Sequence, residues 1–362
     1  MKDVPSIADL DYALPPERIA QEPLPDRASA RLLVIRRGSA GAVHATVRDL
    51  PRLLPPATLV VLNDTKVIPA RLVGRRAATG GRAEVLLVRR ADGAGAWRVL
   101  LRTRGRPRAG EVFRFDTIEA VLRERGVKGE AVVDLRAVGG SGDVDEEIGR
   151  VGLVPLPPYI RRAPGPRDAE RYQTVYARVP GSVAAPTAGL HLDADLLGDL
   201  RAAGHETAFV TLHVGPGTFR PIEGDRIDAH AMDGEWIDVS REAAEAIDRA
   251  RAAGRAILAV GTTVVRALES AALAATDPRT AVSPLRGDTS LYILPGHRFA
   301  AIDALLTNFH LPRSTLLALV MAFHGVGPTR AAYEEAVRAG YRFYSYGDAM
   351  LILPSGGAGR EG

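Results

Sequence analysis

The clearest indication of the fold is the segment Ala256-Ile257-Leu258-Ala259-Val260-Gly261-Thr262-Thr263-Val264-Val265-Arg266. Its five apolar residues are enough for a buried strand, which Gly261 ends. Thr262 and Thr263 come next, and threonine is a natural N-cap for the helix that carries Arg266. The N–H groups at the start of such a helix are free to bind an anionic or carboxylate ligand. The stretch therefore predicts a strand, a ligand-binding turn and a helix.

Three further polar clusters lie where an apolar run breaks off. They are residues 185–191 (APTAGLH), 213–220 (HVGPGTFR) and 307–315 (TNFHLPRST). In open α/β sheets, ligands bind beyond the carboxyl ends of the strands, so we expect the clusters to converge on one active site. The turn at Gly261 is not a G-x-G-x-x-G dinucleotide motif, and the chain contains neither a Walker A lysine motif nor a G-x-S-x-G elbow.

The fold class expected is α/β with two parts of different character. After the proline-rich connector 155–166, apolar strands alternate with helices, for example at 240–253, from Ser314 and near 329–339. This alternation predicts a larger domain with helices covering a mostly parallel sheet. Residues 59–154 instead show short apolar runs between Gly-rich turns, which predicts a small antiparallel β-barrel. We expect the Gly-rich tail 355–362 to be disordered.

Composition narrows the class of protein. The 362 residues are 46% hydrophobic and 25% charged, as in an ordinary soluble protein of one large or two ordinary domains. The absence of cysteine excludes disulfides, thiolate metal sites, iron–sulfur clusters and a cysteine nucleophile. The N-terminus lacks a signal-peptide pattern and no apolar run reaches membrane-spanning length. We expect a cytoplasmic protein.

Positive charge is concentrated in the predicted barrel. The net charge is +4, yet residues 71–110 hold eleven arginines and two acids, a formal charge of +9. A bias of 44 Arg to 3 Lys explains why arginine replaces lysine, but it does not explain the missing acids. We interpret this stretch, which includes Arg102 and Arg104, as a cationic surface for a phosphate backbone.

Histidine dominates the candidate chemistry, because five of the eight lie near breaks between apolar runs. Metal binding is one alternative, but no two of the five have the close spacing of helix-borne zinc ligands and no H-E-x-x-H occurs. We expect no metal. His324 fits a structural role. His191, His213 and His310 each end a run beside Gly, Asn or Pro and are our acid/base candidates.

Three other motifs each allow a structural and a functional reading. Gly215-Pro216-Gly217 is equally a tight turn or a close approach of backbone to ligand. Residues 63–66 (NDTK) could be a strand-end turn, although Lys66 is rare in a chain dominated by arginine. Residues 341–348 hold four aromatic rings that fit either the core or the holding of a base out of its stack.

Taken in order, these stretches resemble one family, the S-adenosylmethionine:tRNA ribosyltransferase-isomerases that make epoxyqueuosine. The resemblance runs from residues 11–16 to 341–350, nearly the whole chain, and includes three more long matches at 62–72, 155–160 and 171–176. Two departures stand out. Asp233 replaces the second histidine of the family's His-x-Met-His, and Arg27-Ala28-Ser29-Ala30-Arg31 replaces its Arg-Asp-x-Ser-Arg, so only Arg27 and Arg31 carry over there.

The resemblance implies a fold, a reaction and partners. The barrel, residues 59–154, would be inserted into a discontinuous catalytic domain of residues 1–58 and 155–362. The enzyme would transfer and isomerise the ribosyl part of S-adenosylmethionine onto 7-aminomethyl-7-deazaguanine at the wobble position of a tRNA with a GUN anticodon, releasing adenine and methionine. S-adenosylmethionine would be the co-substrate, with no metal or further cofactor, and we expect a monomer.

The resemblance and the motifs together assign site residues. His191, His213 and His310 are the catalytic candidates, with the base and the acid among them left open. The residues expected to bind S-adenosylmethionine are Thr187, Gly215, Gly217, Thr218, Gly261, Thr262, Thr263, Arg266, Asn308 and Ser314. The residues expected to bind tRNA or its base are Asn63, Asp64, Lys66, Arg71, Arg102, Arg104, Arg220, His230, Glu235, Tyr346 and Asp348.

Two alternative functions remain open on sequence alone. The basic stretch would also suit a tRNA-binding module without chemistry, although clusters of Gly, Thr and His are not needed for that. A methyltransferase of the α/β class would also use S-adenosylmethionine, but its Gly-rich loop after the first strand is missing. Its product would be S-adenosylhomocysteine rather than adenine and methionine.

Overall fold

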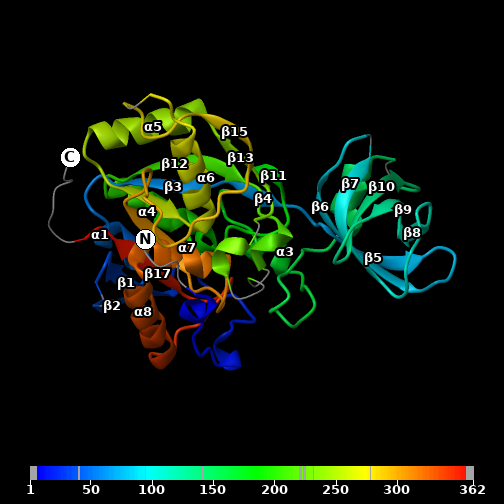
Figure 1. Ribbon diagram of the computed structural model, residues 1–362, viewed down its shortest axis with the longest axis horizontal. Helices are drawn as coiled ribbons and strands as arrows, with labels where there is room; N and C mark the ends of the chain where they lie inside the picture. Colours follow the sequence, from blue (N-terminus) through cyan, green and yellow to red (C-terminus); the bar gives the residue numbers. More distant parts are fainter. Residues whose placement is uncertain are drawn as a thin grey trace.

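The computed structural model describes residues 6–355 except positions 40, 94, 141, 220, 221, 223–225, 231 and 278. It has a large α/β body and a closed β-barrel beside it (Figure 1). The tail that we expected to be disordered is residues 355–362. Of these, only residue 355 belongs to the described part of the chain. None of the described helices is long and apolar enough to cross a membrane.

The body is built on a sheet of nine strands within the described residues. Because the side chains of a strand alternate between faces, neighbouring residues such as Val60 and Val61 belong to two different hydrophobic clusters. The strands, in spatial order, are β15 (Leu285–Thr289), β13 (Glu235–Val239), β12 (Glu206–Leu212), β3 (Leu59–Asn63), β14 (Ile257–Val260), β16 (Ala304–Asn308), β17 (Ala349–Leu353), β1 (Arg31–Arg36) and β2 (Ala42–Thr46).

This sheet is mixed, so the expectation of a mostly parallel sheet was wrong. The central strands β12, β3, β14 and β16 are mutually parallel. However, β13, β15 and β2 join antiparallel neighbours, and β17 runs antiparallel to β16 and parallel to β1. The alternation of strand and helix that suggested a parallel sheet holds only for the centre, while β1 and β2 pair directly as neighbours in sequence.

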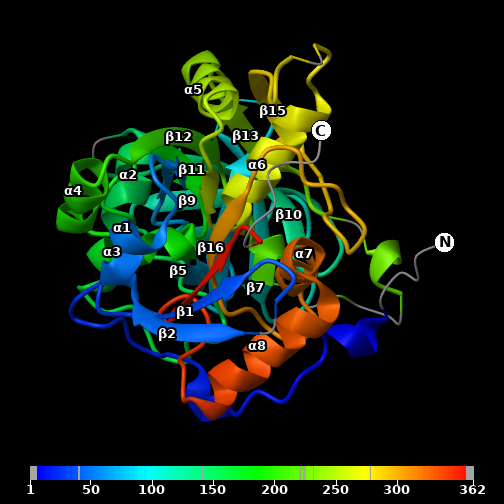
Figure 2. The ribbon, with the colours of Figure 1, turned by 90° about the vertical axis from the view of Figure 1, so that its left-hand side faces the viewer.

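Helices cover both faces of the sheet. One set of helices packs against one face of the sheet, and a second set packs against the opposite face. Figure 2 shows α8 beside β1 and β2. The first set is α5 (Arg241–Ala252), α6 (Thr262–Leu273), α7 (Thr315–His324) and α8 (Val326–Arg338), and the second is α1 (Leu50–Leu53) and α4 (Ala194–Ala202).

The helices predicted near 240–253, from Ser314 and near 329–339 are confirmed as α5, α7 and α8. Ser240 and Ser314 accept capping hydrogen bonds from backbone N–H groups at the starts of α5 and α7. The predicted threonine cap of α6 was wrong, because Gly261 occupies the N-cap with φ +94° and Thr262 is already helical. Glycine adopts that left-handed backbone without the steric cost that threonine would meet.

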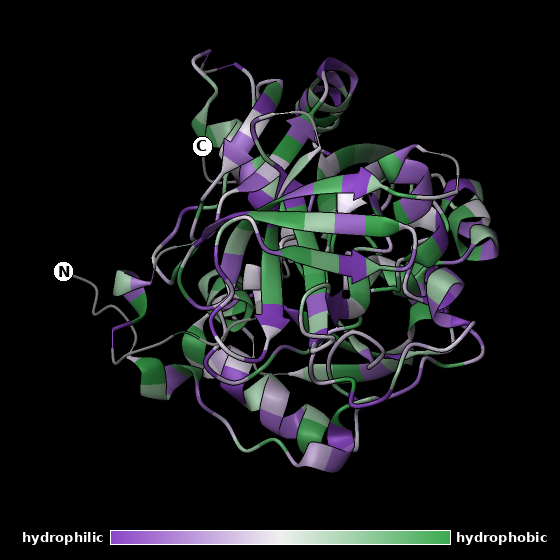
Figure 3. Cartoon of the chain, turned by 90° about the vertical axis from the view of Figure 1, so that its right-hand side faces the viewer, coloured by the Kyte–Doolittle hydropathy of each residue, from purple (hydrophilic) through white to green (hydrophobic). Residues whose placement is uncertain are grey.

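The closed barrel is antiparallel, as predicted. Apolar residues of its strands point inward around a core that also takes Ile148 of α2 (Val144–Val151). Hydrophobic and hydrophilic residues alternate along strands in Figure 3, as expected for strands with one buried face. The barrel strands are β5 (Arg71–Arg76), β6 (Arg82–Arg90), β7 (Ala96–Thr103), β8 (Val112–Phe115), β9 (Ile118–Arg125) and β10 (Glu130–Ala137).

The chain leaves the body after β3, not before it. All five residues of Leu59–Asn63 are buried, because the strand lies between two parallel neighbours in the centre of the sheet. The sequence interpretation had placed this strand in the barrel segment. A small parallel ribbon of β4 (Thr65–Val67) and β11 (Val179–Ser182) lies where the chain leaves and returns. The short helix α3 (Asp168–Arg171) follows the connector.

Short 3-10 helices occupy several of the remaining connections. They are η1 (Ile7–Leu10), η2 (Pro16–Arg18), η3 (Val47–Asp49), η4 (Thr187–His191), η5 (Pro216–Phe219) and η6 (Ile227–Ala229).

Candidate active site

A pocket lies beyond the carboxyl ends of the parallel strands β14 and β16, the place expected from the topology. We call it the central pocket. The polar clusters of the sequence do converge there. The predicted residues that line it are Thr187, Thr218, Gly261, Thr262, Thr263, Asn308, His310 and Ser314.

Two helix N-termini border the central pocket. Gly261, Thr262 and Thr263 begin α6, and Ser314 caps α7. The first N–H groups of a helix have no partner within the helix, and the aligned peptide dipoles favour negative charge at this end. Two such ends at one pocket favour an anionic group of a ligand, such as a carboxylate.

Asn308 supplies the most informative polar group. Its Nδ2 donates to the carbonyl oxygen of Tyr344 at 2.9 Å and lies 3.2 Å from Nε2 of His191. Its Oδ1 is buried and has no hydrogen-bond partner among the described residues. The hydroxyl of Tyr344, also at the pocket, is in the same situation. Because buried polar groups are normally paired, both atoms suit a ligand's polar groups.

His310 is the only one of the three candidate histidines among the residues that line the described central pocket. Burial lowers its pKa to about 3, so the ring is neutral at neutral pH. A ring nitrogen, Nε2, lies 2.8 Å from the hydroxyl of Thr307. A neutral imidazole here can donate or accept one hydrogen bond at the ligand.

His191 lies behind Asn308, in an adjoining pocket that we call the arginine pocket. Burial, followed by the charges of Arg342 and Arg27, lowers the pKa of His191 to about 4. The two pockets share Ser345 as a lining residue. His191 therefore reaches the central pocket through the amide of Asn308 rather than directly.

His213 lies apart from both pockets. Its Nδ1 is 2.7 Å from the hydroxyl of Thr65, and its ring stacks on Trp236 with centroids 4.9 Å apart. Burial lowers the pKa of His213, whereas the negative charge of Asp64 acts to raise it. Gly181 allows this packing, since a Cβ there would come within 2.5 Å of Nε2 of His213. His213 is not among the residues that line the central pocket, whereas the next residue, Val214, is.

Comparison with known proteins now places the chain. A family model described as "Queuosine biosynthesis protein" matches residues 7–352. The chain belongs to this family.

Relatives in the family agree over almost the full length. The S-adenosylmethionine:tRNA ribosyltransferase-isomerase of Anaeromyxobacter sp. (strain K) is 51% identical, and the match covers 96% of this chain and 99% of that protein. The protein of the same name from Moorella thermoacetica is 48% identical over 96% and 99%. The crystal structure of S-adenosylmethionine tRNA ribosyltransferase from Thermotoga maritima is 36% identical, with a TM-score of 0.53 over 95% of this chain and 100% of that one.

The loop of residues 215–218 is held by a buried ion pair. Arg266 contacts Glu235, and both side chains are 4% exposed. The other oxygen of Glu235 accepts hydrogen bonds from the Gly215 N–H at 2.7 Å and the Thr218 hydroxyl at 3.2 Å. Of these four residues only Thr218 lines the central pocket. Arg266, Glu235 and Gly215 therefore position the loop.

Gly217 and His230 lie in the same region. A Cβ on Gly217 would come within 2.3 Å of the Asp233 carboxylate. Asp233, where this chain departs from the family pattern, therefore packs against Gly217. His230 makes an edge contact with Tyr292, with ring centroids 5.9 Å apart. Arg220, also predicted to bind tRNA, lies outside the described residues.

The predicted tRNA-binding residues at the end of β3 are mostly buried structural groups. The amide of Asn63 bonds both backbone groups of Leu212 and the hydroxyl of Thr263. Asp64 accepts hydrogen bonds from Arg178 and Thr211. Lys66 is exposed on β4. The structure therefore does not bring Asn63 and Asp64 to the surface.

Two more predicted tRNA-binding residues are buried near the arginine pocket. The hydroxyl of Tyr346 donates to Asp168 at 2.9 Å while its side chain lines that pocket. Asp348 accepts hydrogen bonds from the backbone N–H groups of Arg31 and Arg342, at 3.1 and 2.8 Å. Asp348 thus ties β1 to the loop before β17.

The predicted barrel residues form a separate group. Arg71 pairs with Glu84 through two hydrogen bonds of 2.9 and 3.0 Å. Arg71 and Arg102 line a groove that also includes Arg161 of the connector. Arg102 and Arg104 are exposed on β7 and the loop after it. These arginines lie on the barrel side of the molecule, outside the central pocket.

Tyr159, Tyr344 and Ser345 are among the pocket residues that the sequence did not predict. Tyr344 has φ +71°, a left-handed conformation that is rare for an aromatic residue, and its ring stacks on Tyr159 at 4.4 Å. The hydroxyl of Tyr159 in turn bonds that of Ser345. Both tyrosines lie in stretches that the sequence singled out, but only the folded chain shows which rings face the pocket.

Among the described residues, no group of three or more His, Cys, Asp or Glu side chains is placed to hold a metal ion. The expectation of a metal-free enzyme stays a prediction.

Proposed function

We propose that this chain is an S-adenosylmethionine:tRNA ribosyltransferase-isomerase. It transfers and isomerises the ribosyl moiety of S-adenosylmethionine onto 7-aminomethyl-7-deazaguanine at the wobble position of tRNA, giving epoxyqueuosine-tRNA, adenine and methionine. The full-length family match and the curated relatives support the reaction. The observation that carries it in the structure is the central pocket, where two helix N-termini border the buried Oδ1 of Asn308, which has no hydrogen-bond partner in the described part of the chain.

The residues of the central pocket fit the chemical groups of S-adenosylmethionine. The N-termini of α6 and α7 suit the methionine carboxylate. The faces of Tyr159 and Tyr344 suit a sulfonium cation, because the faces of aromatic rings attract positive charge. The Oδ1 of Asn308 can accept from an amine or a hydroxyl group. The sulfonium supplies the electronic activation for the reaction when the co-substrate is bound.

His310 is the first candidate for the proton transfers of the reaction. A base must remove a proton from the 5′ carbon and a donor must help adenine leave, and His310 is the candidate histidine that lines the pocket. His191 acts through Asn308, which it contacts. His213 supports the strand end that leads to Val214. We assign catalysis to His310 and a positioning role to the other two.

The exposed arginines of the barrel, including Arg102 and Arg104, are proposed to bind the anticodon arm of a tRNA with a GUN anticodon. The barrel strands between Arg71 and Ala137, together with α2 packed on their core, form the inserted domain in this proposal, and the rest of the chain forms the catalytic domain. We further propose a cytoplasmic monomer that needs no metal.

The test is incubation of the protein with labelled S-adenosylmethionine and tRNA that carries 7-aminomethyl-7-deazaguanine. Adenine and methionine should appear only when both substrates are present. S-adenosylhomocysteine as the product would instead identify a methyltransferase. Binding of tRNA without consumption of S-adenosylmethionine would identify a binding module.

A further inference from the structure

The arginine pocket brings together three guanidinium groups from distant parts of the chain. Arg27 precedes β1, Arg171 ends α3 and Arg342 lies in the loop before β17. Within the described residues, no Asp or Glu lines this pocket. His191 completes its polar lining, and its low pKa keeps it uncharged at neutral pH. The pocket is therefore cationic.

Two of these arginines are fixed by backbone carbonyl groups and not by carboxylates. Arg27, whose side chain is buried, donates to the carbonyl oxygens of Leu190 and Glu170, both at 3.0 Å. Arg171 donates to the carbonyl oxygens of Leu24 and Pro25. In the described part of the chain, neither guanidinium has a carboxylate oxygen within the 4.0 Å of an ion pair. Their positions are set while their charges stay uncompensated by direct contact.

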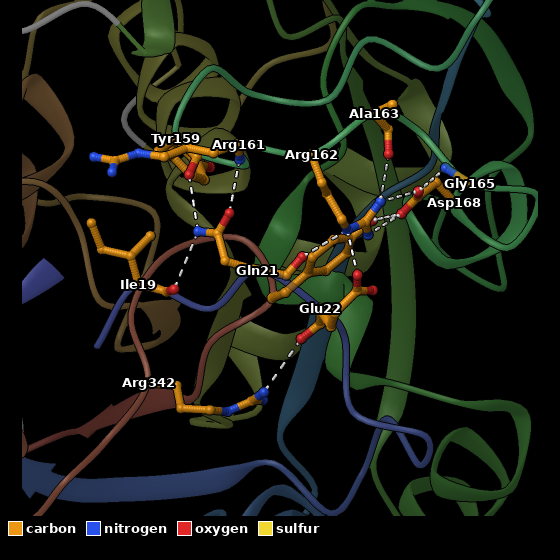
Figure 4. Close-up of polar contacts among 11 residues, drawn as sticks. Ile19, Gln21, Glu22, Tyr159, Arg161, Arg162, Ala163, Gly165, Asp168 and Arg342 are labelled. Carbon is orange, nitrogen blue, oxygen red and sulfur yellow. Dashed lines mark hydrogen bonds and ion pairs between the residues drawn. The ribbon is translucent and has the colours of Figure 1, made fainter. Parts of the chain in front are cut away.

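Nearby acids are engaged elsewhere. Glu22 and Asp168 both pair with Arg162 (Figure 4), and these three residues lie outside the lining of the arginine pocket. Asp348 lies 3.8 Å from Nε of Arg342 and is already bonded to two backbone N–H groups. Burial and then the charge of Arg171 lower the pKa of Arg27, although Glu170 and Asp193 act in the opposite direction. Arg171 is thus close enough to Arg27 for the two positive charges to repel each other.

A purely structural role does not account for this arrangement. Arginines that only tie loops together would gain from carboxylate partners, and three cations around an open pocket repel one another. An anion would remove that repulsion. Guanidinium groups match the oxygens of a phosphate through paired, charge-assisted hydrogen bonds.

We propose that the arginine pocket binds a phosphodiester group of the substrate tRNA next to the nucleotide that enters the central pocket. This inference rests on the proposed function. Its position supports it, because the two pockets share Ser345 and the amide of Asn308 contacts His191 between them. A phosphate held here places the flanking backbone beside the site of reaction.

Arg342 gives the cleanest test, because its side chain is 31% exposed and its contacts are long, 3.8 Å to the Asp348 carboxylate and 3.4 Å to the carbonyl oxygen of Glu22. Arg342→Gln should weaken binding of the substrate tRNA and reduce the slope of log K against log salt by about one, the value for one lost phosphate contact. The affinity for S-adenosylmethionine, measured by calorimetry without tRNA, should not change. Arg342→Lys should restore part of the tRNA affinity.

Arg338→Gln on α8 is the matched control, since that side chain is 74% exposed and pairs with Glu335 away from the pocket. It should leave both the tRNA affinity and the salt slope unchanged. If Arg342→Gln folds poorly, Arg171→Lys provides a second variant, and its tRNA affinity should fall because lysine cannot keep both carbonyl contacts and the bidentate phosphate geometry.

Three results would overturn the inference. An unchanged tRNA affinity and salt slope in Arg342→Gln, with normal turnover by the unmodified enzyme, would reject the phosphate site alone. A loss of affinity for S-adenosylmethionine instead would show that the pocket holds the carboxylate of that substrate. No adenine release by the unmodified enzyme with both substrates would reject the proposed function together with the inference.

Discussion

The amide nitrogen of Asn308 lies 3.2 Å from Nε2 of His191. The same nitrogen donates to the carbonyl oxygen of Tyr344, so one amide group joins the wall of the central pocket to the imidazole behind it. With Nδ2 as the donor, Nε2 of His191 must accept and therefore carries no proton. Burial and the charges of Arg342 and Arg27 lower the pKa of His191 and keep its ring neutral, and Oδ1 of Asn308, which has no partner among the described residues, can accept a hydrogen bond from a ligand.

Asn308→Asp should raise the pKa of His191. A carboxylate in place of the amide removes the donor and adds a negative charge beside the ring, which favours imidazolium by about 1–3 pH units. Titration of the histidine ring protons by NMR measures this directly. His324 serves as an internal control, because its pKa of about 4 arises from burial and the charge of Arg37. An unchanged His191 titration would contradict the inferred hydrogen bond.

Acid should destabilise the protein well above the range in which carboxylates titrate. The folded-state pKa is about 3 for His310 and about 4 for His191 and His324, against 6.5 in the unfolded chain. Below pH 6.5 the unfolded chain binds protons that the folded protein does not. The free energy of unfolding should therefore fall as pH decreases, by up to about 1.4 kcal/mol per pH unit for each histidine.

Urea denaturation at several values between pH 7.5 and pH 5 would measure that slope. His324→Gln should reduce it by the contribution of one proton, because only two of the three buried rings remain. Stability that does not change over this range would mean that the three rings take up protons in the folded state.

Removing one partner of the buried pair Arg266–Glu235 should be costly. Arg266→Met leaves the Glu235 carboxylate buried without its cation, a change that typically costs about 3–5 kcal/mol in free energy of unfolding. Adding Glu235→Gln to that variant should recover part of the loss, since glutamine can still accept the hydrogen bonds from Gly215 and Thr218. Urea denaturation of the single and double variants gives both values. A loss below about 1 kcal/mol for Arg266→Met would contradict the assigned positioning role.

The sequence predicted the fold class and the barrel because local patterns specify both. Glycine and threonine after five apolar residues led correctly to the start of α6 and the central pocket. The position of β3 was missed because its apolar run fits a barrel strand as well as a central parallel strand. The antiparallel pairing of β16 with β17 depends on how the chain returns after α7 and α8, which no local pattern specifies.

The sequence predicted which residues lie near the central pocket better than it predicted what each of them does. Thr187, Asn308 and His310 line the central pocket as expected. Arg266 and Glu235 were predicted to contact substrates, and in the structure they form a buried pair that joins elements far apart in sequence. Tyr344 could not have been chosen over Tyr346, because the backbone conformation that turns it to the pocket is unusual for tyrosine.

The barrel arginines should contribute affinity for tRNA and little to the chemical step. Replacing Arg102, Arg104 and Arg106 by alanine should raise KM for tRNA and flatten its salt dependence, with kcat nearly unchanged. The same charge change at the exposed residues Arg241, Arg249 and Arg330, on α5 and α8, is the control and should alter KM far less. Equal effects of the two sets would indicate non-specific attraction rather than a barrel site.

His310→Ala should lower kcat by about 10²–10⁴-fold, because a positioned acid or base typically contributes that much. His324 provides a matched control: it is also buried with a low pKa, but it accepts a hydrogen bond from the Gly38 N–H far from the pocket. His324→Ala should reduce stability and leave the turnover of the folded fraction near normal.

Single-turnover adenine release, normalised to the folded fraction, separates the two effects. Solvent deuterium exchange into the 5′ position of recovered S-adenosylmethionine then separates the roles. Loss of both exchange and release in His310→Ala would identify His310 as the base, whereas retained exchange without release would identify it as the acid. Near-normal turnover in His310→Ala would reject His310 as the acid or base of the reaction.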